Sequence, residues 1–118
     1  TALLAVAWTG TNLLAVGANG RVRRSADGTS WSTLTSLSSS AWGSSNACLA
    51  VGSWAGRTVV VGQGGNIAHS DDEGASWTVQ SIATLGAPET GGVDMNAVDY
   101  DNNKLTIGGQ VGVFVYEI

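Results

Sequence analysis

The sequence predicts an all-β fold made of repeated four-stranded antiparallel sheets, and three observations support this prediction. First, 17 of the 118 residues are Gly and one is Pro, a composition that suits tight turns between short strands. Second, short apolar runs alternate with turn residues along the chain. Third, the pattern repeats, because Trp8, Trp54 and Tyr100 are spaced by 46 residues, as are Trp31 and Trp77. Four short strands in about 40–50 residues are typical of the blades of a β-propeller.

The first repeat, at about residues 3–37, contains four strand-like runs. These runs cover residues 3–8, 13–16, 21–24 and 31–37. Polar residues 9–12 separate the first two runs, and Asn19-Gly20 is typical of a hairpin between the second and the third. The run at 13–16 is apolar at consecutive positions rather than at alternate ones. We therefore expect this strand to be covered on both faces, as in blades that stack around an axis.

The second repeat, at about residues 47–82, has the same order of runs, and a partial third repeat covers about 95–118. Polar linkers at 38–46 and 83–94 join the three repeats. The length favours one domain over residues 1–118, with about two and three-quarter blades in the chain.

The third predicted repeat has no fourth run, and both end blades are expected to expose an apolar sheet face. Exposed apolar faces and unpaired strand edges favour association. We therefore expect a homo-oligomer, a dimer or a trimer, that completes a propeller. An open head-to-tail array or filament is the alternative.

Two polar turns separate the third and fourth runs of the first two repeats, at residues 25–31 and 70–77. In such a turn Asp accepts hydrogen bonds from backbone N–H groups, Gly adopts a positive φ, and Trp covers the turn. The two turns resemble the Asp-box, or BNR repeat, of β-propeller proteins, and the first is one residue shorter. The matching residues are Ser25, Asp27, Gly28 and Trp31 in the first turn, and Ser70, Asp72, Gly74 and Trp77 in the second.

The resemblance implies a propeller in which each box is a structural turn between the third and fourth strands of a blade. It also implies the hairpin before each box, seen at 15–20 and 60–65. The family includes sialidases and other glycosidases, lectins, sorting-receptor ectodomains, photosystem assembly factors and phage tail proteins, so the fold leaves the function open. From this resemblance we expect the chain to be similar to the non-catalytic phage or bacterial members of the family.

The charged residues do not match a catalytic site, and we expect no enzymatic activity. The sialidase resemblance implies three arginines from separate blades, whereas Arg21, Arg23 and Arg24 lie in one run. His69 is the single histidine and Cys48 the single cysteine, so we expect no metal site and no disulfide. No glycine motif for a nucleotide is present, and we expect no cofactor.

Amide and aromatic side chains are the candidate ligand-binding residues, because amides bind sugar hydroxyls and rings stack on the apolar face of a sugar. The amides lie in the hairpins between the second and third runs, where solvated loop tips are the alternative interpretation. Trp42, in a Ser-rich linker, is either an anchor onto a neighbour or a ligand contact. The aromatics spaced by 46 residues either pack in the core or form a repeated stacking site. The candidate set is Asn19, Gln63, Gln110, Trp42, Trp8, Trp54 and Tyr100.

These observations predict a non-enzymatic binding or assembly module, with lectin-like recognition of a glycan or a cell surface. A purely structural virion or filament protein of a phage, and a fragment of a sialidase-like glycosidase, are the alternatives. The net charge of −4 argues against nucleic acid or an anionic membrane as the main partner, and no apolar run is long enough for insertion into a membrane. A surface of Ser, Thr, Asn and Gly is typical of extracellular or virion-associated proteins.

Overall fold

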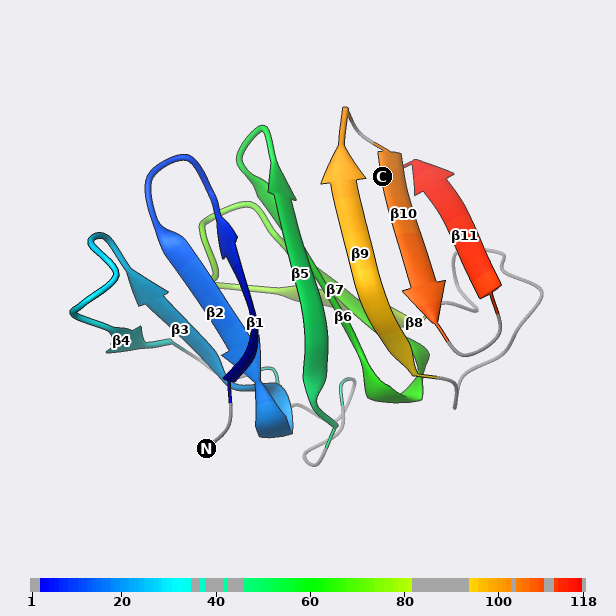
Figure 1. Ribbon diagram of the computed structural model, residues 1–118, viewed down its shortest axis with the longest axis horizontal. Coiled ribbons are helices and arrows are strands. Elements are labelled where there is room, and N and C mark those ends of the chain that lie inside the picture. The colour runs from blue at the N-terminus through cyan, green and yellow to red at the C-terminus, as the bar shows by residue number, and fades with distance from the viewer. Residues whose placement is uncertain are drawn as a thin grey trace.

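The structure, a computed structural model, describes residues 3–34, 37, 42, 46–81, 94–102, 104–109 and 112–117. The described chain is all-β, with antiparallel sheets in which consecutive strands pair (Figure 1). This confirms the predicted all-β class and the four-stranded antiparallel sheets. No helix of the described part of the chain is long and apolar enough to cross a membrane.

Each of the first two sheets has four strands, and we call them blade 1 and blade 2. Blade 1 consists of β1 (Leu3–Trp8), β2 (Leu13–Gly17), β3 (Val22–Ser25) and β4 (Ser32–Thr33). Blade 2 consists of β5 (Cys48–Trp54), β6 (Arg57–Gly62), β7 (Asn66–Ser70) and β8 (Thr78–Ser81). The fourth strand of blade 1 is therefore shorter than the predicted run at 31–37.

The third sheet, blade 3, contains β9 (Met95–Asp101), β10 (Lys104–Gly109) and β11 (Gly112–Glu117). Short 3₁₀ turns, η1 (Ala18–Gly20) and η2 (Gln63–Gly65), connect the second and third strands of blades 1 and 2. Asn19 in η1 has φ 58°, the left-handed conformation that Asn tolerates in tight turns.

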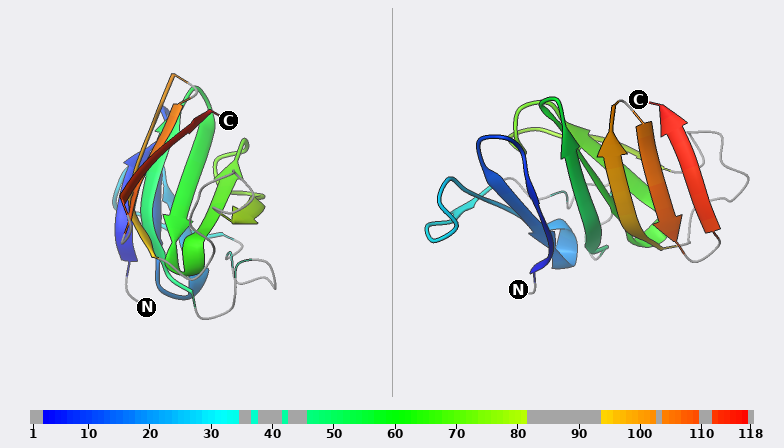
Figure 2. Two further views of the ribbon diagram at one scale, coloured as in Figure 1. Left: turned by 90° about the vertical axis from the view of Figure 1, so that its right-hand side faces the viewer. Right: turned by 45° about the horizontal axis from the view of Figure 1, so that its top comes forward.

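Blade 2 lies between the other two blades, and their first strands β1, β5 and β9 are neighbours (Figures 1 and 2). One apolar cluster fills the junction of blades 1 and 2 and includes Leu14, Val16, Cys48 and Val60. A second fills the junction of blades 2 and 3, with Val59, Val61, Ile67, Met95, Tyr100, Leu105 and Ile107. Successive residues of β6, Val59 to Val61, thus enter opposite clusters, because neighbouring residues of a strand point to opposite faces.

Cys48 is fully buried in the first cluster. Burial in apolar surroundings raises the pKa of its thiol to about 12, because the thiolate loses its hydration there. Cys48 is therefore a small apolar core residue.

Trp42 lies in the core rather than on the surface, with only 1% of its area exposed. Its indole Nε1–H donates to the Asn46 carbonyl at 3.0 Å, and its own carbonyl accepts from the side-chain amides of Asn46 and Asn66. The interpretation of Trp42 as a ligand contact is wrong, because the ring is covered. The alternative interpretation as an anchor onto neighbouring structure describes it correctly.

Removal of the Trp42 ring should destabilise the fold. We expect Trp42→Ala to lower the free energy of unfolding by about 3–5 kcal/mol, the usual cost of deleting a buried large aromatic ring. Chemical denaturation followed by circular dichroism measures this change. Trp42→Phe is the matched control with a smaller expected loss, because most of the ring volume is kept. A Trp42→Ala variant as stable as the parent contradicts the assignment.

Candidate functional site

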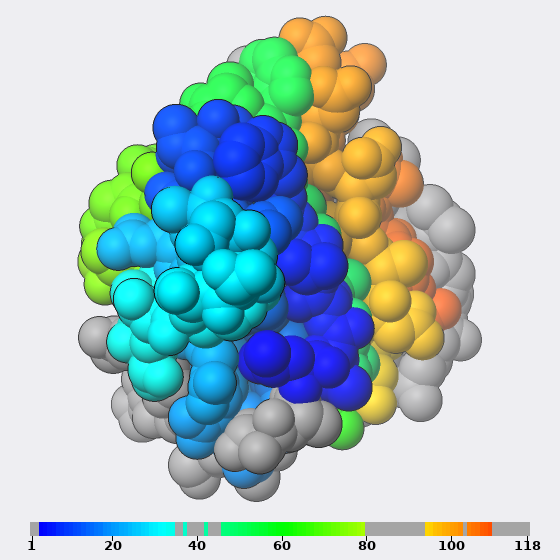
Figure 3. Space-filling view, turned by 60° about the vertical axis from the view of Figure 1, so that its left-hand side comes forward, coloured from blue at the N-terminus to red at the C-terminus, as the bar shows by residue number. Residues whose placement is uncertain are grey.

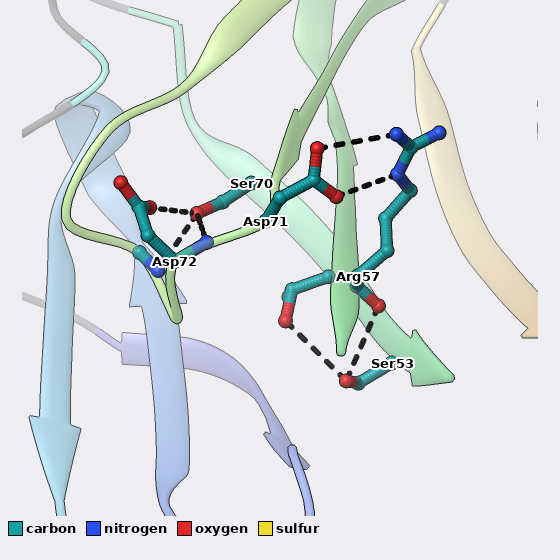
Figure 4. A network of polar contacts seen from close by, with 7 residues as sticks. Ser53, Arg57, Ser70, Asp71 and Asp72 are labelled. Carbon is teal, nitrogen blue, oxygen red and sulfur yellow. Dashed lines mark hydrogen bonds and ion pairs between the residues drawn. The ribbon is translucent and has the colours of Figure 1, made fainter. Parts of the chain in front are cut away.

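The second Asp turn, residues 70–77, is held by hydrogen bonds within itself (Figure 4). Ser70 Oγ accepts from the backbone N–H of Gly74 at 2.8 Å and donates to Asp72 Oδ1 at 2.6 Å. Asp72 in turn accepts from the hydroxyl and the backbone N–H of Ser76. The hydrogen bonds from Ser70 and Ser76 lower the pKa of Asp72 to about 2. The Asp72 carboxylate therefore accepts its hydrogen bonds from Ser70 and Ser76 of its own turn.

The first Asp turn, residues 25–31, has the same kind of hydrogen bonding. Ser25 Oγ accepts from the Gly28 N–H at 2.8 Å, and Asp27 Oδ1 accepts from the N–H groups of Thr29 and Ser30 at 2.9 Å each. The backbone N–H groups of Ser30 and Thr29 hold the pKa of Asp27 well below its usual range. Gly28 has φ 83°, which favours Gly at this position.

Glu73 connects the second Asp turn to blade 1. Its carboxylate accepts from the hydroxyls of Thr9 and Thr11 and from the amide of Asn12, all in the turn between β1 and β2. Arg24 of β3 donates to the Glu73 carbonyl at 3.2 Å. The Asp-box motif did not indicate a role for Glu73, because this residue occupies a variable position of the motif. The one-residue length difference between the two turns was the available signal.

Asp71 points to a third set of partners, on its own blade. Arg57 at the start of β6 forms a two-pronged ion pair with it, Nε to Oδ1 at 2.8 Å and Nη2 to Oδ2 at 3.1 Å (Figure 4). The Arg57 guanidinium lowers the pKa of Asp71, and burial lowers the pKa of the nearby His69. The acidic run at 71–73 therefore serves three different structural contacts.

Within the described part of the chain, the predicted ligand residues do not come together in one place. Asn19 is exposed in η1, whereas Gln63 in η2 accepts a hydrogen bond from the Ala47 N–H at 2.8 Å. Trp42 belongs to the first apolar cluster and Tyr100 to the second. Gln110 lies outside the described residues.

The interpretation that Trp8, Trp54 and Tyr100 occupy one repeated position is wrong. In the strand pairing, Trp8 faces Leu13 and Tyr100 faces Leu105, and the matching residue of blade 2 is Ser53, which faces Thr58. Trp54 lies one position later, and successive residues of a strand point to opposite faces. It therefore meets Tyr100 across the junction of blades 2 and 3, with the rings perpendicular and their centres 6.4 Å apart.

A contiguous apolar surface covers the side of blade 1 that faces away from blade 2. We call it the outer face of blade 1. In Figure 3, β1 and the segment that carries the first Asp turn lie side by side on the surface turned to the viewer. A groove of about 350 Å³ runs along this face. Its lining residues are Leu3, Leu4, Ala5, Val6, Ala15 and Trp31.

The strand register shows that this face has the same construction as the buried junctions. Leu3 is 43% exposed, whereas its counterparts Cys48 and Met95, opposite the equivalent glycines, are fully buried. Trp8 is 55% exposed, whereas its counterpart Tyr100 is buried. The Leu3 position packs against the preceding blade in blades 2 and 3, and the Trp8 position does so in blade 3.

Two arginines share the outer face of blade 1. Val22 of β3 is buried in the first cluster, so its neighbours Arg21 and Arg23 point to the opposite face of the strand. Arg23 occupies the position of Ala68, a core residue of blade 2, because they pair with Ala15 and Val60 respectively. The Nε atoms of Arg21 and Arg23 are buried without a hydrogen-bond partner among the described residues.

Comparisons with known proteins support the fold alone. No protein-family model matches the chain, and no curated protein sequence matches it. Among solved structures, YCF48 bound to a D1 peptide superposes with a TM-score of 0.79 at 19% identity, and YCF48 from Cyanidioschyzon merolae with 0.71 at 17%. The chain is 96% and 98% covered, yet it spans only 36% and 34% of those proteins. The computationally designed Ika4 protein matches with a TM-score of 0.54 at 14% identity, with 100% of this chain and 92% of Ika4 covered. The likeness to YCF48 shows a β-propeller-like fold.

Acid should weaken the contact that Glu73 makes with blade 1. Hydrogen bonds from Thr11, Thr9 and Asn12 lower the pKa of Glu73 from 4.5 to about 2. The stabilisation is therefore fully present above about pH 4.5 and is lost as the pH falls through the folded-state pKa. We expect the difference in unfolding free energy between the parent and Glu73→Gln to be constant above pH 5 and to shrink towards pH 2. Urea denaturation at several pH values measures it, and a difference independent of pH refutes the expectation.

Proposed function

We propose that this chain is a non-enzymatic binding and assembly module, and that its binding surface is the outer face of blade 1. The main supporting observation is that Leu3, Val6 and Trp8 are exposed at positions whose counterparts in blade 3 pack against the preceding blade. Contiguous exposed apolar surfaces of this kind mark interaction sites in folded proteins. A partner on this face removes the same surface from water as the internal junctions do.

The internal junctions favour a protein as the partner. Blade 2 presents the equivalent face to blade 1, where the apolar side chains Leu14, Val16 and Val22 of β2 and β3 cover it. A surface with this chemistry, an apolar sheet face, is therefore the type of partner that fits blade 1. The solved structure of YCF48 bound to a D1 peptide supports a polypeptide partner for a protein of this fold.

The charged residues support binding rather than hydrolysis. Asp72 and Glu73 accept hydrogen bonds that hold turns, and Asp71 is paired with Arg57. Arg24 points to Glu73, away from the side chains of Arg21 and Arg23. A glycosidase needs carboxylates directed at a shared substrate. The acidic groups of the two Asp turns are directed at separate structural partners instead.

Glycan recognition is the second candidate function, and one observation favours it. Trp31, at 37% exposure, lines the groove of about 350 Å³ on the outer face of blade 1, where a sugar ring could stack. A structural role in a virion or filament uses the same face for assembly. An extracellular or virion-associated location stays a prediction.

The assembly proposal is tested by the mass of the protein in solution. We expect light scattering to give at least twice the 11.9 kDa mass of one chain, because association buries the exposed apolar surface. The double variant Leu4→Ser/Trp8→Ser should shift the mass towards that of the monomer. Ala75→Ser, an exposed change on the second Asp turn, is the control with unchanged mass. A monomeric parent protein refutes the proposal.

A glycan array separates the two candidate functions. Specific binding that is lost in Trp31→Ala, together with a monomeric parent protein, favours the glycan function over assembly. Hydrolysis of a sialoside by the parent protein contradicts the non-enzymatic assignment.

A further inference from the structure

On β10, the face of blade 3 that points away from blade 2 has smaller or polar residues at two positions where the other blades have larger apolar ones. We call it the outer face of blade 3. Thr106 and Gly108 of β10 occupy the positions of Leu14 and Val16 in β2, as the strand pairing with Asp99 and Ala97 shows. A hollow of about 270 Å³ lies there, lined by Ala97, Val98, Asp99, Thr106 and Gly108.

The two outer faces are complementary in side-chain size. Blade 1 presents Leu3 and Trp8 where blade 2 has the smaller Cys48 and Ser53. Conversely, blade 3 has Gly108 where blade 2 has Val61 at the matching position. Bulk added on one face thus corresponds to space on the other, the relation that close packing at an interface requires.

The two outer faces also carry opposite charges. Arg21 and Arg23 lie on the outer face of blade 1. Alternation along β9 and β10 places two exposed carboxylates, Asp99 and Asp101, and one ammonium group, Lys104, on the outer face of blade 3. A net negative face opposite two guanidinium groups favours this pairing over contact between two like faces.

The internal junction of blades 2 and 3 shows where these groups would meet. There Trp54, which matches Asp101 in the register, contacts Tyr100, which matches Trp8. The same geometry places an Asp101 carboxylate beside the Trp8 indole, whose N–H is a hydrogen-bond donor. If the outer faces of blade 1 from two copies met instead, arginines would face arginines and large side chains would face large ones.

We infer that the outer face of blade 1 binds the outer face of blade 3 of a second copy of this chain, head to tail. The inference rests on the proposed assembly function and adds the partner and the polarity of the contact. Such a contact joins two different surfaces, so it closes into a ring or continues as an array, depending on the rotation between copies. Each copy therefore has two separate binding faces that can be disabled one at a time.

Two single-face variants test the head-to-tail contact. Val6→Asp places a carboxylate on the exposed apolar face of blade 1, where it opposes the acidic face of the partner. Ala97→Arg fills the hollow of blade 3 with a positively charged side chain that would repel Arg21 and Arg23 of the partner copy. Ala75→Asp and Ala75→Arg make the same charge changes at an exposed position of the second Asp turn and are the matched controls.

The masses of the separate and mixed variants decide between polarities. We expect each variant alone to have the 11.9 kDa mass of one chain in light scattering, and an equimolar mixture to give a particle of twice that mass. The mixture stops at two copies, because Val6→Asp retains only its blade 3 face and Ala97→Arg only its blade 1 face. The control variants should retain the mass of the parent protein.

Other outcomes overturn the inference in distinguishable ways. If Ala97→Arg alone still associates while Val6→Asp does not, blade 1 faces pair with each other, which refutes the head-to-tail contact but leaves the assembly function standing. A monomeric parent protein refutes both. If either variant lacks a cooperative thermal transition, Trp8→Glu and Thr106→Arg, which change the same two faces, replace the pair.

Discussion

The structure depends on the requirement that each blade be covered on both faces by apolar side chains. Blade 2 meets this requirement within the chain, because consecutive residues of β6, Val59 to Val61, are buried in alternate clusters. Burial of this kind contributes about 25 cal/mol for each Å² of apolar surface removed from water. Blades 1 and 3 each have only one covered face among the described residues. The proposed function follows from this asymmetry rather than from any catalytic group.

The polar contacts fix how the blades lie on one another, and the apolar clusters supply the attraction. Hydrogen bonds within each Asp turn set the shape of the turn, and they satisfy backbone N–H groups that no strand pairs. Glu73 then extends one of these turns to the neighbouring blade. The first Asp turn is one residue shorter and has no residue equivalent to Glu73. A partner on blade 1 must therefore be held by the apolar face and the arginines, without a copy of that contact.

The repeat pattern predicted the strands well and the faces less well. The apolar runs and the Gly-rich turns located the strands, because turn chemistry and unbroken apolar runs are local properties of the sequence. The spacing of 46 residues misplaced Trp54. Up to the Asp turns, the second repeat follows the first at 45 residues, as Ser25 and Ser70 show. Only the extra residue of the second Asp turn raises the spacing of Trp31 and Trp77 to 46. A shift of one residue moves a side chain to the other face of a strand. Counting the tryptophans alone could not reveal that shift.

Trp42 was hidden for a different reason, because its burial comes from tertiary contacts that its Ser-rich surroundings do not encode. The same contact explains why residue 62, which faces the Trp42 ring, is a glycine. A Cβ atom on Gly62 would lie 2.9 Å from the Trp42 ring, so the strand has no side chain where the ring packs. Small residues at one surface thus mark the place of a large ring from elsewhere in the chain. The proposed contact between copies relies on the same relation, with Gly108 and Ala97 on the outer face of blade 3 and the exposed Trp8 and Leu3 of blade 1. Within one chain the Trp42 ring fills the space left by Gly62. We propose that, between chains, the outer faces of blades 1 and 3 supply the large and the small side chains of the same kind of contact.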